Sequence, residues 1–209
     1  MIDTIKAQLA DVRIDFDEAT HMYALSGRRL PSVTQIMKPM SLMAYDGVSS
    51  GTLDTAADRG TRAHEQVSNI IRYGVRECDD DTEPYVRAFE RFREDYNPAF
   101  VASEYRCYHK SMGYAGTADI LAVVDGDGRD GIDLIDIKCT SQYHSSMLSA
   151  QLGAYRAMIE SHGIKCRNLY GLQLTRGGNY RFEKIPDGYQ IFVCCLTIYN
   201  AMAMEKLGG

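Results

Sequence analysis

The chain has 209 residues, of which 45% are hydrophobic, and its 23 basic and 28 acidic side chains leave a formal net charge of −5. This length and apolar content suffice for one sizeable core, so we expect a single domain. The acidic balance argues against a protein that coats polyanions non-specifically, but it allows a local basic groove. Six cysteines without a C-x-x-C pair, no apolar leader and no run of membrane-spanning length favour a cytoplasmic protein with no membrane contact.

The amino-terminal quarter contains one hairpin and one short helix in this interpretation. Residues 13–30 alternate polar and apolar side chains on both sides of 18–20, which predicts a hairpin with a tight polar turn. Ser32 is placed to cap a short helix that stops before Pro39. The stretch 41–53 is rich in Ser and Gly and predicts a loop.

Two amphipathic helices are expected next. Apolar residues recur at helical spacing from about residue 54 to 73, which predicts a helix with one face toward the core. A second helix is expected over 82–96, and its apolar stripe predicts four buried aromatic residues: Tyr85, Phe89, Phe92 and Tyr96.

The remainder of the chain combines strands with two further helices. Three apolar runs, 100–109, 117–124 and 132–139, are separated by Gly- and Asp-rich turns and predict an antiparallel meander. This order of elements indicates a mixed α/β fold with helices packed on a sheet. The chain then continues with an amphipathic helix over 145–163, a hairpin over 168–185 and a final helix within 186–209.

Charged residues inside two of these apolar strands need an explanation, because burying charge is costly. Asp136 and Lys138 are two apart in a strand and therefore project from one face. Such a pair alone is as readily a structural salt bridge as a functional one. Asp119 lies in the preceding strand, where antiparallel pairing would bring it beside Asp136. Facing carboxylates repel, and a divalent cation would remove that penalty, which indicates metal-assisted attack on a phosphodiester.

Four short motifs follow one another along the chain: GTRAH at 60–64, GTAD at 116–119, DIKCT at 136–140 and QLGAY at 151–155. In their order and spacing they resemble the motif series of the PD-(D/E)XK nuclease superfamily, most of all its RecB-type and phage exonuclease branch. The resemblance covers about residues 11–181. It implies a restriction-endonuclease-like core, in which a mixed sheet with an antiparallel three-strand meander is flanked by helices and preceded by an amino-terminal hairpin. The implied organisation is one nuclease-like domain over 1–209: a hairpin and loop elaboration (11–53), a nuclease core (54–185) and a carboxy-terminal helix (186–209).

The resemblance also implies roles for individual residues. By position, Asp119 and Asp136 bind the metal together with the backbone carbonyl of Ile137, and Lys138 is the catalytic lysine. His64 matches a helical histidine that adds a metal ligand in this branch. From the residues alone, His64 is an inward-facing histidine of the kind that is more often a satisfied core residue.

Three further residues are expected near the site. Gln151 and Tyr155 match the Q-x-x-x-Y helix that supports the site and contacts the nucleic-acid backbone in the resembling nucleases. For Tyr155, ordinary core packing is an equal alternative, because it lies on an apolar helix stripe. Glu104, in the strand before Asp119, is a candidate further ligand or water-positioning base, although strand alternation leaves its direction open.

Substrate binding is expected to come from local basic residues, with Arg59 and Arg62 beside the GTRAH motif as the first candidates. Each is, taken alone, more often a solvated surface charge. Further candidates for phosphate contacts are Arg28, Arg29, Lys38, Lys110, Arg167 and Arg176, and candidates for stacking on unpaired bases are Tyr45, Tyr114 and Tyr143.

The resemblance implies a DNA nuclease that depends on Mg²⁺ or Mn²⁺, acting as an exonuclease on linear duplex or single-stranded DNA in recombination, repair or phage DNA processing. The cysteine spacings do not reproduce the four-cysteine pattern of relatives with an iron–sulfur cluster, so no cluster is expected. If the chain is phage-encoded, it would act in the host cytoplasm, with a recombination or single-strand-binding partner and as an oligomer or a monomer. The alternatives are a catalytically inactive nucleic-acid-binding or assembly protein of the same fold and a structure-specific endonuclease, and RNA is not excluded as substrate.

Overall fold

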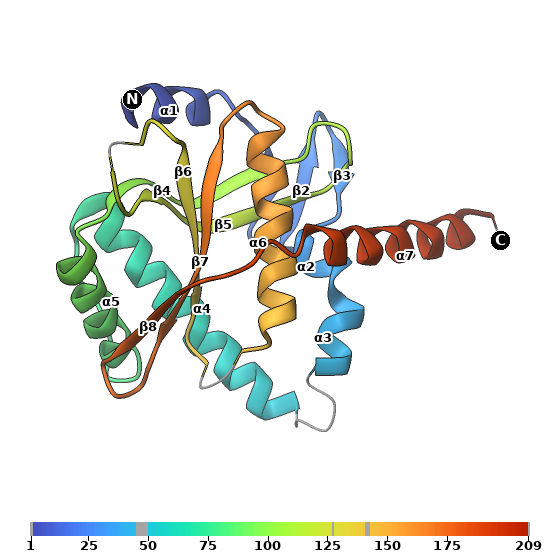
Figure 1. Cartoon of the computed structure of the whole chain (residues 1–209). Helices are drawn as coiled ribbons and strands as arrows, with labels where there is room; N and C mark the ends of the chain where they lie inside the picture. The colour runs from blue at the N-terminus through green and yellow to red at the C-terminus, as the bar shows by residue number, and fades with distance from the viewer. Residues whose placement is uncertain (1, 45–49, 127, 141–142, 209) are drawn as a thin grey trace.

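The structure is a computed structural model that describes residues 2–44, 50–126, 128–140 and 143–208. It is a mixed α/β fold with one three-stranded antiparallel sheet and one five-stranded mixed sheet, as the sequence predicts (Figure 1). The order of the large sheet is β4-β5-β6-β7-β8. Its strands are β4 (Ala99–Tyr108), β5 (Ala115–Val123), β6 (Ile132–Lys138), β7 (Cys166–Leu174) and β8 (Tyr180–Lys184).

The expected meander is confirmed, because β4, β5 and β6 pair antiparallel in sequence order. β6 and β7 then pair parallel, and this pairing was not predicted. A parallel neighbour requires a crossover connection, which helix α6 (Ser145–Glu160) provides. The last pair, β7 with β8, is the expected hairpin.

The small sheet contains the predicted amino-terminal hairpin, formed by β1 (Asp15–Asp17) and β2 (Met22–Leu25). A third strand, β3 (Arg28–Leu30), was not predicted and pairs antiparallel with β2. The turn between β2 and β3 has φ of 50° at Ser26 and 78° at Gly27. Two consecutive positive φ values are what a two-residue hairpin turn requires, so the Ser-Gly pair was the available signal.

The segment that follows the small sheet is more helical than expected. Ser32 caps α2 (Val33–Ile36) as predicted, and its hydroxyl accepts the N–H of Gln35 at 3.0 Å. Helix α3 (Lys38–Ala44), however, occupies the start of the expected 41–53 loop, and Pro39 lies in its first turn. Proline is tolerated there because the first N–H groups of a helix have no intrahelical acceptor.

The two expected amphipathic helices are present as α4 (Ser50–Tyr73) and α5 (Glu83–Tyr96). Because α4 begins at Ser50, the predicted loop is wrong at this end too, while residues 45–49 lie outside the described residues. In α5, Tyr85, Phe89 and Phe92 are buried as predicted. Tyr96 is 41% exposed, which corrects the expectation that it is buried. It is the last residue of the helix, where the chain turns away.

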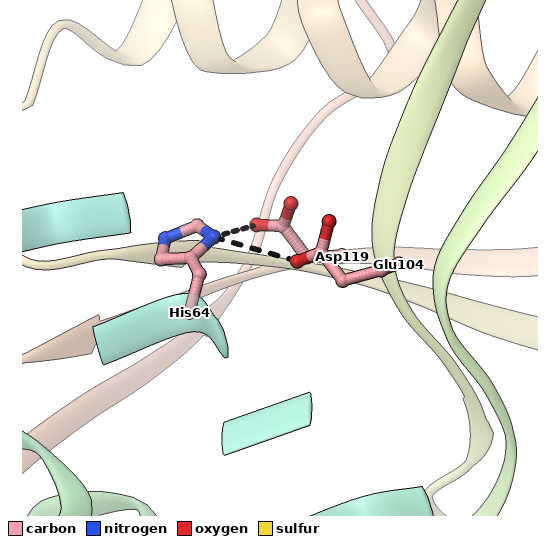
Figure 2. Close-up of side chains that lie close together, drawn as sticks. All are labelled: His64, Glu104 and Asp119. Carbon is pink, nitrogen blue, oxygen red and sulfur yellow. Dashed lines mark ion pairs between the residues drawn. The ribbon is translucent and has the colours of Figure 1, made fainter. Parts of the chain in front are cut away.

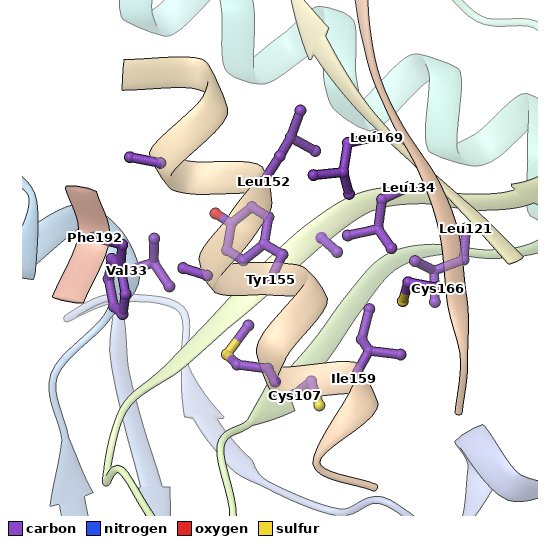
Figure 3. Packing of buried hydrophobic residues seen from close by; sticks show 14 of the residues in the cluster. Val33, Cys107, Leu121, Leu134, Leu152, Tyr155, Ile159, Cys166, Leu169 and Phe192 are labelled. Atoms are coloured by element: carbon purple, nitrogen blue, oxygen red, sulfur yellow. The ribbon is translucent and has the colours of Figure 1, made fainter. Parts of the chain in front are cut away.

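The large sheet lies between two helical layers (Figure 1). Ile120 and Ile135 pack with α4 and α5 on one face, whereas their neighbours Leu121 and Leu134 pack with α6 on the other, as Figure 3 shows. Strands covered on both faces are apolar at consecutive positions. The unpredicted helix α1 (Ile2–Ala10) and the expected final helix α7 (Tyr189–Gly208) complete the chain.

Helix α7 projects from the body of the molecule toward the carboxyl end (Figure 1). In the described part of the chain, no helix combines the length and the hydropathy that crossing a membrane requires. The subdivision into 11–53, 54–185 and 186–209 stays a prediction.

Candidate metal centre and catalytic cluster

The candidate site lies where β5 and β6 separate. Their ladder includes the pair Ile120–Ile135, so continuing the register by one residue brings Asp119 beside Asp136. The side chain of Asp119 turns toward β6, where its Oδ2 accepts the backbone N–H of Ile137 at 2.7 Å. A carboxylate thus serves as an acceptor for a strand N–H at this point, and it anchors Asp119 between the two strands.

Asp136 and Lys138 project from one face of β6, as their spacing predicts, and form an ion pair with 2.5 Å between Lys138 Nζ and Asp136 Oδ2. Lys138 Nζ also donates to Gln151 Oε1 at 3.3 Å, and Gln151 Nε2 donates to the Tyr155 hydroxyl at 3.1 Å. Helix α6 therefore supports the lysine through a polar chain. This gives Gln151 the partner that its place among apolar neighbours requires.

His64 of α4 approaches the same carboxylate from another side (Figure 2). Its Nδ1 lies 3.5 Å from Asp119 Oδ2 and 3.9 Å from Glu104 Oε1. One ligand atom from each of these three residues lies within 4.8 Å of the others. Glu104, whose direction the sequence left open, therefore turns toward the site. Asp136 does not join this group of three in the described part of the chain, and its role as a ligand stays a prediction, as does that of the Ile137 carbonyl.

Two carboxyl groups of the site are harder to ionise than usual. Burial, reinforced by the negative charge of Asp119, raises the pKa of Glu104 to about 7. Burial also raises the pKa of Asp136 to about 6, against the opposing effect of Lys138. Raised pKa values of this kind mean that burial removes more solvation from each carboxylate than its neighbours replace. A cation bound beside them would favour the ionised form of both groups.

His64 and Asp119 are shifted in the sense of an ion pair. Burial disfavours the imidazolium, but Asp119 outweighs it and raises the pKa of His64 well above its ordinary value. For Asp119, burial opposes ionisation, yet His64, Lys138 and the Ile137 N–H together hold its pKa below the usual range. Without a metal, the proton on His64 therefore acts as a partial counter-charge.

The donor set fits a hard divalent cation. Carboxylate oxygens are the ligands that Mg²⁺ prefers, and Mn²⁺ accepts oxygen together with imidazole. Asp136 is 1% exposed, and its Oδ2 is paired with Lys138, whereas none of the described residues donates a hydrogen bond to its Oδ1. Buried acceptors are nearly always satisfied, so Oδ1 indicates that a cation or ordered water completes the site.

Close packing between β5 and α6 fixes the supporting tyrosine. Tyr155 is 4% exposed and belongs to the apolar cluster of Figure 3. A Cβ atom on Gly116 would lie 2.8 Å from Tyr155 Cε1. Glycine at 116 thus leaves room for the ring, and Tyr155 combines core packing with a polar contact to Gln151.

The two arginines beside the GTRAH motif have other partners. Arg62 forms ion pairs with three carboxylates, including Asp58 at 3.1 Å. The guanidinium of Arg59 lies over the ring of Tyr85, 5.9 Å from its centroid. Their roles in binding substrate stay predictions, which the observed pairings do not favour.

The remaining candidates for substrate contacts divide into exposed and buried residues. Arg28, Arg29, Lys38, Lys110 and Arg176 are exposed. Arg167 is paired with the buried Asp133 and is a structural residue. Tyr114 is fully buried, which corrects the expectation that it stacks on bases. Tyr143 is half-buried, and Tyr45 lies outside the described residues.

A groove of about 1670 Å³ gives access to the cluster. Its lining includes His64, Glu104 and Lys138. Arg72 and Ser68 of α4 also line it, and sequence reasoning missed both. The available signal was that His64, Ser68 and Arg72 follow one another at intervals of four residues, which places all three on one helix face.

The protein is thus a mixed α/β fold in which the cluster of His64, Glu104 and Asp119 lies beside the Asp136–Lys138 ion pair.

No protein-family model matches the chain, and no curated protein matches its sequence. The crystal structure of an alkaline exonuclease (LHK-Exo) from Laribacter hongkongensis is similar at 12% sequence identity and a TM-score of 0.47, over 85% of this chain and 89% of that chain. LHK-Exo in complex with dAMP is similar at 13% identity and a TM-score of 0.47, over 86% and 90%.

Proposed function

We propose that this chain is a nuclease that hydrolyses phosphodiester bonds of DNA with Mg²⁺ or Mn²⁺, acting as an exonuclease on linear duplex or single-stranded substrate. The observation that carries the proposal is the convergence of His64, Glu104 and Asp119 on one point next to the Lys138–Asp136 pair. Three ligands of this kind beside a lysine, at the edge of a groove, suit metal-assisted hydrolysis.

In the proposed reaction a water oxygen attacks phosphorus, one P–O bond breaks, and the departing oxygen takes up a proton. A bound divalent cation would polarise the phosphoryl oxygen and lower the pKa of water. Asp119 and Glu104 offer it carboxylate oxygens, and His64 offers a ring nitrogen. Lys138, held by Asp136 and Gln151, is the cation of this chain that stabilises developing negative charge on the phosphate.

The test is degradation of end-labelled linear duplex and single-stranded DNA with Mg²⁺, Mn²⁺ or EDTA. We expect metal-dependent release of label, and a loss of about 100-fold or more in kcat for Lys138→Ala. Arg176 lies in the exposed turn between β7 and β8. The Arg176→Ala variant is compared with the wild type for an effect on DNA binding alone. Covalently closed circular DNA separates exonuclease from endonuclease action, and a matched RNA reveals the sugar preference.

The rival is a catalytically inactive nucleic-acid-binding protein of the same fold. This alternative predicts that the protein binds DNA but cleaves it with none of the metals. A cooperative thermal transition would show that the protein tested is folded. The gathered carboxylates disfavour it, since like charges without a cation destabilise the sheet. If Asp119→Ala and Lys138→Ala each cleave DNA at the wild-type rate, the assignment of the site is refuted.

A further inference from the structure

Helix α4 contributes more than a histidine to the candidate site. His64, Ser68 and Arg72 follow one another at intervals of four residues, so they form a single stripe on the helix. This stripe faces Ser103 and Glu104 of β4. The stripe and the strand segment together line the groove, and His64 and Glu104 are both members of the three-residue cluster.

Arg72 is an exposed residue whose hydrogen bonds nevertheless go to the strand. Its Nε donates to the hydroxyl of Ser103 at 3.1 Å. Its Nη2 donates to the backbone carbonyls of both Ser103 and Glu104, the second at 3.3 Å. The Ser68 hydroxyl shares a 2.9 Å hydrogen bond with that of Ser103. Ser68 and Ser103 are buried, so water does not easily replace this bond.

The strand needs such support at this position. Glu104 has φ of 47°, a left-handed conformation that costs a non-glycine residue about 1–2 kcal/mol. Successive carbonyls of a regular strand point in opposite directions, yet the carbonyls of Ser103 and Glu104 both accept a hydrogen bond from Nη2 of Arg72. Both observations place a local distortion of the backbone at Glu104, between the ladder pairs Ser103–Ile120 and Tyr105–Ala118.

Two simpler interpretations of Arg72 explain less. As a cation in the last turn of α4, it complements the helix dipole, but any lysine would do this without contacting β4. As a bidentate phosphate contact through Nε and Nη2, it would need these two donors free, whereas both are engaged with the strand. Strained backbone held by specific partners is typical of functional sites.

We propose that Arg72, assisted by Ser68, is a positioning residue that holds the backbone of Glu104 in its left-handed conformation and so presents the carboxylate to the metal beside His64 and Asp119. The inference rests on the proposed function for the identity of the metal. Partners of metal ligands generally change metal affinity by about 10–100-fold when removed.

The experiment measures Mn²⁺ affinity of the full chain by calorimetry, without DNA. Arg72→Met is expected to weaken Mn²⁺ binding at least tenfold in the wild-type background. In the Glu104→Gln background the same change is expected to cost less than twofold, because the carboxylate that Arg72 positions is already absent. Equal losses in both backgrounds would mean general scaffolding and would overturn the proposal.

Two further variants separate geometry from charge. Arg72→Lys keeps the positive charge but lacks the planar fork, so we expect its Mn²⁺ affinity to remain at least fivefold below that of the wild type. Full recovery would overturn the proposal in favour of a charge effect. Arg76→Met is the matched control, because Arg76 pairs with Glu90 and Glu83 away from the site, and its Mn²⁺ affinity is expected to equal that of the wild type.

If Arg72→Met does not fold, Ser68→Ala takes its place in the same two backgrounds, with an expected loss of about threefold that disappears beside Glu104→Gln. Cleavage is not the readout of this experiment. If the effect of Arg72→Met on Mn²⁺ affinity depends on the Glu104 carboxylate but the protein cleaves no DNA, the proposed nuclease function is refuted and the positioning role of Arg72 stands. If the protein is a metal-dependent nuclease but the effect of Arg72→Met does not depend on Glu104, the positioning role is refuted and the nuclease function stands.

Discussion

Glu104 concentrates the unusual features of this protein in one residue. Its backbone has a positive φ, and its carboxylate lies near both His64 and Asp119. Burial and a neighbouring negative charge raise its pKa to about 7. The positive φ, the burial of the carboxylate and the charge of Asp119 work against stability in the absence of a cation. Their coincidence indicates that the local structure serves ligand binding rather than folding.

The raised pKa predicts a pH dependence of stability for the metal-free protein. An acid whose pKa is higher in the folded than in the unfolded state binds more protons when folded, so its contribution to the free energy of unfolding falls as pH rises. For Glu104 this fall occurs between about pH 4.5, the ordinary pKa of a glutamate, and about pH 7, its pKa in the folded protein. Denaturant unfolding in EDTA across this range measures it.

The informative quantity is the difference between wild type and Glu104→Gln. The amide does not titrate, so the variant is expected to lose less stability than the wild type between pH 4.5 and 7. Histidines elsewhere titrate equally in both proteins and cancel. Parallel stability curves would contradict the raised pKa.

Gly116 gives a steric prediction. In Gly116→Ala the new methyl group would lie 2.8 Å from Tyr155 Cε1, and overpacking of this kind typically costs about 1–3 kcal/mol. We expect a lower free energy of unfolding and, because Tyr155 supports Gln151, reduced activity. Gly51→Ala is the control, since nothing lies within 4 Å of its Cβ position in α4. There alanine is expected to stabilise slightly.

At the scale of elements, the parallel pair β6–β7 is held by a buried ionic contact. Asp133 has no exposed surface, and it accepts hydrogen bonds from Arg167 Nε at 3.0 Å, from Asn168 Nδ2 at 2.8 Å and from the Val124 N–H at 3.0 Å. A buried carboxylate with all of these partners specifies which strand lies beside β6. It also explains why Arg167 is unavailable for substrate.

Removing the arginine is therefore expected to be severe. Arg167→Met leaves Asp133 buried without its counter-charge, which typically costs about 3–5 kcal/mol of unfolding free energy. Chemical denaturation measures the loss. Asp133→Asn in the same chain should recover part of it, because the amide carries no charge. If the double variant is no more stable than Arg167→Met alone, the loss arises from packing rather than from unpaired charge.

Several elements were predictable because their signal is local. The capped helix α2, the meander β4–β5–β6 and helices α4 and α5 follow from side-chain periodicity and turn residues. The loop expected over 41–53 was wrong because Pro39 was interpreted as a stop, although proline also fits a first helical turn. Tyr96 follows the apolar spacing of α5, and its ring contacts Phe182 and Tyr180 of the edge strand β8. At the end of the helix these contacts still leave it 41% exposed, which spacing alone does not reveal.

At the scale of the whole molecule, metal binding and folding are expected to be linked. A ligand that binds only the folded state stabilises it by about 2.7 kcal/mol at 100 times its Kd. We expect Mn²⁺ or Mg²⁺ to raise the Tm of the wild type in a concentration-dependent way, as measured by calorimetric scanning. The cluster joins α4, β4 and β5, so the effect should extend to the whole cooperative transition.

The control for this prediction is Asp119→Asn, which removes a charged ligand at the centre of the cluster. Its Tm is expected not to respond to the metal, while the Arg76→Met variant responds as the wild type does. A metal response that survives in Asp119→Asn would locate the cation elsewhere on the molecule.

The sequence by itself determined the face of β6 from which Asp136 and Lys138 project, and it indicated Asp119 as their neighbour. Strand alternation and short antiparallel connections decide these features, and both are local. Only the tertiary structure decided that Glu104 turns toward His64, that Arg72 and Ser68 hold its backbone, and that Arg62 is engaged by nearby acids. The contacts of Glu104 with His64 and of Arg72 and Ser68 with β4 join residues about 30 or more apart in sequence, or depend on a backbone conformation that residue type does not favour, so they arise from packing and not from pattern. The ion pairs of Arg62 with Asp79 and Asp81 depend on how the connector between α4 and α5 folds back on α4.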